Sequence, residues 1–113
     1  MPNPLNYYVL NAQIADIGTA NTVHFVAPVA GSVKELRVTI FGAITGANDV
    51  VTVAVDGVSL SPTLTVLQAG SAAGTTAVAQ FNAPVRAGSR ITVANSGAST
   101  GTAAAAYSLT LQG

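Results

Sequence analysis

The feature that most constrains this chain is hydrophobic alternation with a period of two, which recurs in short β-branched segments. In DVVTVAV, for example, Val51, Val53 and Val55 fall on one side of the backbone. Such alternation is typical of half-buried β-strands, and no long window shows the apolar spacing of an amphipathic helix. The sequence therefore predicts an all-β fold.

Turn residues separate these segments at intervals of roughly ten residues, as in a sandwich or barrel. Asp56-Gly57 predicts a two-residue hairpin, and Pro62 is incompatible with a central strand. The expected strands cover residues 5–14, 21–27, 35–43, 49–55, 58–60, 64–68, 75–81, 90–95 and 103–111. We expect one domain over residues 1–113, an antiparallel β-sandwich of about eight strands with an extended segment at about residues 1–6.

A short pattern occurs twice in the chain, as FVAPVAGS from Phe25 and as FNAPVRAGS from Phe81. Each copy predicts a strand that stops before Pro28 or Pro84, followed by a glycine turn into the next strand. The repetition fits the two Greek keys of a jelly roll, although common turn chemistry could also recur by chance. The residues expected to face the core are Leu36, Val38, Ile40, Val51, Val53, Val55, Ile91, Val93, Leu109 and Leu111, with Tyr107 on the same face as the last two.

Charge is scarce, because only 7% of the residues are charged and the net charge is zero. A soluble domain usually has roughly 25% charged residues. We infer that part of the surface is covered in the working state; the alternative is that Thr, Ser, Asn and Gln solvate it. A neutral chain offers no basic surface for nucleic acid or anionic lipid. No run reaches the ~20 apolar residues of a spanning helix, and without signal-peptide features we expect synthesis in the cytoplasm.

Reactive side chains are too few and too scattered for a recognisable catalytic, cofactor or metal site. Cys is absent, and His24, the one histidine, alternates with Val23 and Phe25 and should face away from them. The Gly-rich stretches 70–74 and 97–101 lack a Walker lysine. The acidic residues occur singly, as Asp16, Glu35, Asp49 and Asp56. We expect no enzymatic activity, no cofactor and no bound metal.

Three stretches resemble small jelly-roll cement, or decoration, proteins of phage heads. They are VHFVAPVAGSVKELRVTIFGAITGANDVVTVAVDGVSL, FNAPVRAGSRITVANSG and AAYSLTL. The resemblance implies a virion protein on the outer surface of the head that bridges neighbouring subunits of the major capsid protein, with no catalytic residues. The same pattern of strands and turns also fits tail, baseplate and fibre proteins. The alternative is therefore a phage tail or fibre β-sandwich module that binds carbohydrate or another virion protein.

Two kinds of contact follow from these expectations. The N-terminal segment and exposed loops should conform to a neighbouring capsid surface, and low charge on a small β-domain predicts a homo-oligomer, either a dimer or a trimer. Phe41 should face away from Val38 and Ile40 if the strand stays regular to its end. The residues expected to contact the capsid or another copy are Pro2, Asn3, Pro4, Leu5, Tyr7 and Phe41.

Overall fold

A computed structural model describes residues 7–100 and 102–113 of the protein. The regular elements in these residues are β-strands. They are β1 (Tyr7–Ile14), β2 (Asn21–Val26), β3 (Gly31–Ile40), β4 (Asp49–Val55), β5 (Val58–Ser59), β6 (Leu64–Val66), β7 (Thr76–Val85), β8 (Arg90–Asn95) and β9 (Ala105–Gln112). Within those residues, no helix is long and apolar enough to cross a membrane.

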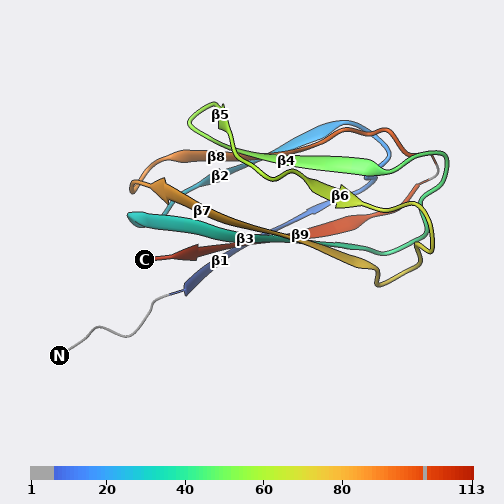
Figure 1. The fold of residues 1–113 in the computed structure, drawn as a ribbon, viewed down its shortest axis with the longest axis horizontal. Coiled ribbons are helices and arrows are strands. Elements are labelled where there is room, and N and C mark those ends of the chain that lie inside the picture. Colours follow the sequence, from blue (N-terminus) through green and yellow to red (C-terminus); the bar gives the residue numbers. More distant parts are fainter. Residues whose placement is uncertain (1–6, 101) are drawn as a thin grey trace.

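The strands form two stacked antiparallel sheets (Figure 1). One sheet has the order β1-β9-β3-β7, and the other has the order β2-β8-β4-β5, with β6 also paired to β4. The chain changes sheet between β1, β2, β3 and β4, and again between β6, β7, β8 and β9. This is the strand order of a jelly roll, so the predicted antiparallel, jelly-roll-like sandwich is confirmed. The described residues contain nine strands, of which β5 has only two residues.

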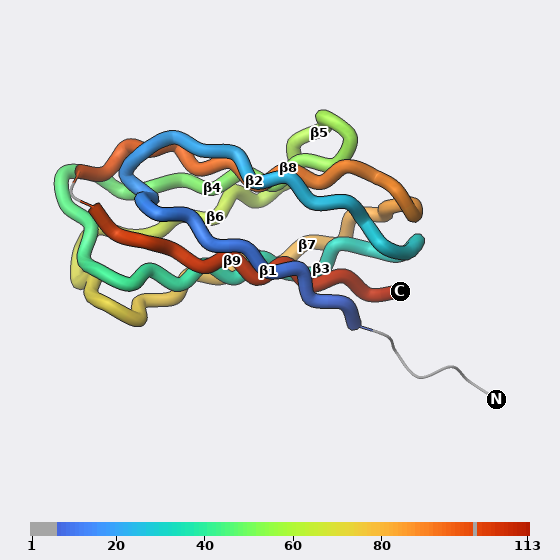
Figure 2. The backbone as a smooth tube through the Cα atoms, turned by 180° about the vertical axis from the view of Figure 1, so that it is seen from behind, coloured from blue at the N-terminus to red at the C-terminus, as the bar shows by residue number. Residues whose placement is uncertain are grey.

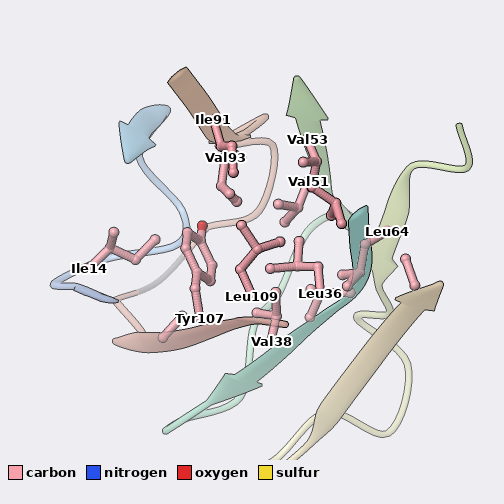
Figure 3. Packing of buried hydrophobic residues seen from close by; sticks show 14 of the residues in the cluster. Ile14, Leu36, Val38, Val51, Val53, Leu64, Ile91, Val93, Tyr107 and Leu109 are labelled. Carbon is pink, nitrogen blue, oxygen red and sulfur yellow. The ribbon is translucent and has the colours of Figure 1, made fainter. Parts of the chain in front are cut away.

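A single hydrophobic core lies between the sheets. Figure 3 shows Tyr107 and Leu109 of β9 rising toward Ile91 and Val93 of β8. Every predicted core residue is buried except Val55, which is only half-buried because it is the last residue of β4 before the hairpin. The period-two pattern therefore identified the inward faces of the long strands.

The Asp56-Gly57 hairpin forms as predicted. Val55 pairs with Val58 across it, and both turn residues have positive φ, 49° at Asp56 and 87° at Gly57. Positive φ at both central positions defines a type I′ turn, whose twist matches that of the two strands.

The repeated pattern behaves differently in its two copies. β2 stops before Pro28 as predicted, but β7 continues through Pro84 to Val85. The prediction failed because β7 is an edge strand with β3 on one side only, where a residue without an N–H is tolerated.

The two glycine turns also differ. Gly88 has a φ of 89°, whereas Gly31 begins β3, earlier than the predicted Glu35. A Cβ at Gly31 would collide with the backbone of Gln112. The two copies lie side by side because β2 pairs with β8: Ala27 N–H donates to the Ser89 carbonyl at 2.9 Å, and Gly88 N–H donates to the Ala27 carbonyl at 2.8 Å.

Val53→Asp should unfold the domain. Val53 is fully buried, and an unpaired carboxylate there costs several kcal/mol, against a total stability of about 5–15 kcal/mol. Circular dichroism and urea unfolding would measure the loss. Thr52→Asp is the matched control, because Thr52 is the adjacent residue on the outer face; equal loss of structure in both variants would contradict the assigned faces.

Candidate binding surface

The outer face of the four-stranded sheet is a regular surface built from β1, β9, β3 and β7. Its rows follow from the strand registers: Val9 lies beside Thr110, and Thr110 lies beside Glu35, which pairs with Gln80. We call it the β1–β7 face. Its members are Tyr7, Val9, Asn11, Gln13, Ser32, Glu35, Arg37, Thr39, Thr76, Val78, Gln80, Asn82, Pro84, Ala106, Ser108, Thr110 and Gln112. Most are short or uncharged.

The charges on the β1–β7 face compensate each other. Arg37 donates through Nη2 to Glu35 Oε1 at 2.9 Å and through Nε to the same oxygen at 3.1 Å. Lys34, at the bulge of β3, donates to Asn82 Oδ1 at 2.8 Å. A partner protein that covered this face would meet Arg37 and Glu35 already paired, whereas the Lys34 ammonium beside them has a neutral amide as its partner.

A shallow hollow of about 400 Å³ lies on this face over β1 and β9. Ser108 Oγ donates to Asn11 Oδ1 at 2.9 Å within it. Its lining residues are Asn11, Ala12, Gln13, Ala106, Tyr107 and Ser108. Because Ala106 has only a methyl group, the longer amides of Asn11 and Gln13 stand around a depression.

A second hollow, of about 330 Å³, lies beside the β4–β5 hairpin and is lined by Asp56, Pro84, Val85, Arg86 and Ser89. Its polar groups also hold the backbone: Asp56 Oδ1 accepts from Arg90 N–H, and Ser89 Oγ accepts from Arg86 N–H, each at 3.0 Å. These hydrogen bonds explain the presence of Asp56 and Ser89 as residues that stabilise turns.

The predicted contact residues are not gathered at one place. Tyr7 is 57% exposed at the start of β1, and Phe41 is 51% exposed just beyond the end of β3. Pro2, Asn3, Pro4 and Leu5 lie outside the described residues. Other large apolar side chains are exposed as well: Val9, Val26, Val58, Leu67 and Val78.

Buried polar residues organise the loops at one end of the sandwich. Asp49 is fully buried, and its carboxylate accepts a hydrogen bond from Ser99 N–H at 3.0 Å and another from the Ser99 hydroxyl. This pair ties the loop between β8 and β9 to the start of β4. Thr45 and Thr100 bond to each other through both backbones beside it.

Asn95 performs a similar task for the loop between β1 and β2. Its Nδ2 donates to the carbonyls of Ile17 and Thr19 at 2.8 and 2.9 Å, and its Oδ1 accepts from Asn21 N–H at 3.0 Å. One buried amide thus satisfies three backbone groups that the loop leaves without strand partners.

Sequence reasoning missed Asp49 and Asn95, although the alternation contained the signal. Asp49 is in phase with Val51 and Val53, and Asn95 is in phase with Ile91 and Val93. Both therefore point inward at a strand end. The sequence predicted Asp49 at the start of a strand but indicated no partner for it.

The remaining titratable residues have structural positions. Asp16 accepts from Gly18 N–H at 2.9 Å and from the Thr19 hydroxyl at 3.1 Å. His24 is exposed on the outer face of the other sheet, away from Val23 and Phe25 as predicted. In the described part of the chain, no three His, Cys, Asp or Glu side chains are grouped so that they could hold a metal ion.

Tyr107 is the largest fully buried side chain. Its hydroxyl has no hydrogen-bond partner among the described residues. Burial, and secondarily the Asp49 carboxylate, raises the pKa of this hydroxyl from 10.0 to about 12. The neutral phenol is therefore strongly favoured in the folded state.

Comparison with known proteins yields distant structural likenesses but no match by sequence. No protein-family model matches the sequence, and no curated protein matches it. A family 35 carbohydrate-binding module from Clostridium thermocellum has a similar structure, with a TM-score of 0.48 and 16% sequence identity over 94% of this chain and 90% of that one.

Alkaline pH should weaken the fold through Tyr107. Because the folded pKa of about 12 exceeds the unfolded value of 10.0, the stabilisation from this group is complete below pH 10 and is lost as the pH rises toward 12. The loss should reach about 2–3 kcal/mol.

Urea unfolding at several pH values from neutral to alkaline would measure this loss, with Tyr107→Phe as the matched variant. The variant should lack this part of the pH dependence, and it should be no less stable at pH 7, because it removes a buried hydroxyl without a partner. Identical alkaline slopes in the two proteins would contradict the assignment.

Proposed function

We propose that this protein is a non-catalytic cement protein of a phage head, which binds the outer surface of the assembled capsid and bridges subunits of the major capsid protein. The observation that carries the proposal is the β1–β7 face. Its oppositely charged Arg37 and Glu35 pair with each other at 2.9 Å, and Val9 and Val78 are exposed among short polar side chains.

Such a face suits broad packing against another protein. Protein interfaces gain specificity from shape complementarity and are depleted of charge at their centres. Covering the Arg37–Glu35 pair would cost less desolvation free energy than covering either charge without its partner. Many copies on one shell also act together, so each contact can be weak.

The stabilising effect requires no chemistry. A ligand that binds only the assembled shell favours assembly by roughly RT ln(1 + [L]/Kd) per site. A clamp across two coat subunits meets this condition, because the unassembled subunit presents only half of its site. The engagement of Asp16, Asp49 and Asp56 in backbone hydrogen bonds is consistent with a structural role for the few charged residues.

Binding should depend on the β1–β7 face. Val78→Glu should weaken binding to assembled capsids by about tenfold or more, since a carboxylate in an apolar contact costs more than the ~1.4 kcal/mol that corresponds to a factor of ten. Val26→Glu is the matched control: Val26 is also an exposed valine on an edge strand, but on the outer face of the other sheet.

Co-sedimentation of each variant with capsids and with unassembled coat subunits would measure this. We expect wild type and Val26→Glu to pellet with capsids and neither to bind free subunits. Equal loss in both variants, or equal binding to free subunits, would refute the proposal. Labelling of the protein on phage tails instead of heads would refute it as well.

The hollow over β1 and β9 favours a second candidate, a tail or fibre module that binds carbohydrate. The amides of Asn11 and Gln13 and the hydroxyl of Ser108 surround it, and such groups can form hydrogen bonds with sugar hydroxyls. Under this alternative, a glycan-binding screen should yield a ligand whose affinity falls about tenfold or more in Asn11→Ala, as expected for the loss of a direct hydrogen bond. A screen without a ligand would exclude it.

A further inference from the structure

β1 forms one end of the four-stranded sheet, and among the residues that the structure describes it has only β9 beside it. The direction of its backbone groups follows from the ladder. Phe41 N–H donates to the Ala104 carbonyl at 2.8 Å, so the even-numbered residues of β9 direct their backbone groups toward β3. In an antiparallel strand the direction alternates. The odd-numbered residues of β9 therefore face β1, where they pair with even-numbered residues.

The odd-numbered residues of β1 consequently have their N–H and C=O groups directed away from β9, toward a free edge. They are Tyr7, Val9, Asn11 and Gln13. None is proline, and β1 contains no charged residue. Proline and charge are the usual devices that prevent an edge strand from pairing with another chain.

The other edge of the same sheet has such a device. β7 contains Pro84, which pairs with Ser32 of β3. The same alternation directs the backbone nitrogen of Pro84 away from β3, so the outer edge of β7 lacks a donor there. On the other sheet, β5 and β6 have two and three residues. The long edge of β1 therefore lacks the protection against strand pairing that Pro84 gives to the edge of β7.

The inward side of β1 also remains incompletely covered. Tyr8 and Leu10 pack against the core but are only partly buried, because no strand lies on their outer side. A second strand along this edge would cover both side chains and extend the core.

We propose that β1 pairs antiparallel with β1 of a second copy about a two-fold axis at Leu10. In this register Tyr7 lies opposite Gln13 of the other copy and Val9 opposite its Asn11, so all the free backbone groups of the edge are used. The two four-stranded sheets then form one continuous sheet. The proposal does not depend on the capsid function, because it concerns the protein alone.

A second copy fits this edge better than a charged partner does. A two-fold axis places the same strand on both sides of the contact, so a strand with a net charge would repel its copy. β1 avoids this repulsion. β2 lies on the same flank of the sandwich (Figure 2), but it is shorter than β1. Pairing of two β2 strands about a two-fold axis at His24 would place this residue against His24 of the other copy.

Sedimentation tests the proposal directly. Wild-type protein at tens of micromolar should sediment as a dimer. Asn11→Pro should weaken dimerisation by about tenfold or more, because it removes a backbone donor and places a ring at the contact. Its fold should persist, since the Asn11 N–H faces away from β9. Gln80→Pro is the matched control on the edge of β7 and should remain a dimer. A wild-type monomer or trimer, or a folded Asn11→Pro dimer of unchanged affinity, would overturn the proposal.

Amide hydrogen exchange in the wild type keeps the proposal testable if the proline variant does not fold. The amides of Val9 and Asn11 should be protected in concentrated protein and should lose protection on dilution, whereas those of Tyr8 and Leu10, bonded to β9, should not. Free Val9 and Asn11 amides together with protected His24 and Val26 amides would place the contact on β2 and overturn the proposal.

Discussion

The fold depends on the pairing of β9 between β1 and β3. This last strand bonds to the first strand on one side and to β3 on the other. The four-stranded sheet therefore cannot be completed by any shorter N-terminal part of the chain. Its inward residues, including Tyr107 and Leu109, form the centre of the core, while Ser108 and Thr110 form the middle of the β1–β7 face. One strand thus supports both the interior and the proposed contact surface.

The few acidic residues of the chain have identifiable structural roles. Asp16, Asp49 and Asp56 accept backbone hydrogen bonds in turns and loops, and Glu35 pairs with Arg37. Three acidic residues therefore serve the architecture, and on the β1–β7 face Glu35 and Arg37 stand among mostly uncharged side chains. A surface of this kind is suited to contacts through shape and backbone pairing, which are the two modes that the capsid and dimer proposals use.

The edges of the sandwich are treated unequally. Pro84 interrupts the outer edge of β7, whereas β1 presents uninterrupted backbone groups beside partly buried Tyr8 and Leu10. A dimer through β1 would join two β1–β7 faces into one surface around a two-fold axis. For a cement protein this would enlarge the area in contact with a shell without adding chain length, because both copies would present the same face.

The sequence by itself determined the fold class, the approximate strands, the Asp56-Gly57 hairpin and the inward residues, because each depends on local alternation or turn chemistry. Sequence reasoning misplaced the end of β7 at Pro84 and the start of β3, because the structural effect of a proline or glycine depends on the neighbouring strands. Pro84 is tolerated on an edge, and Gly31 is required by the close approach of Gln112.

Only the tertiary structure decided which strands are edges, which side chains form the β1–β7 face, and that Asp49 meets Ser99 across the end of the sandwich. The physical reason is that alternation specifies on which side of a strand a residue lies, but not which strand lies beside it. Strand neighbours are chosen by packing between segments far apart in the chain, as with β1 and β9.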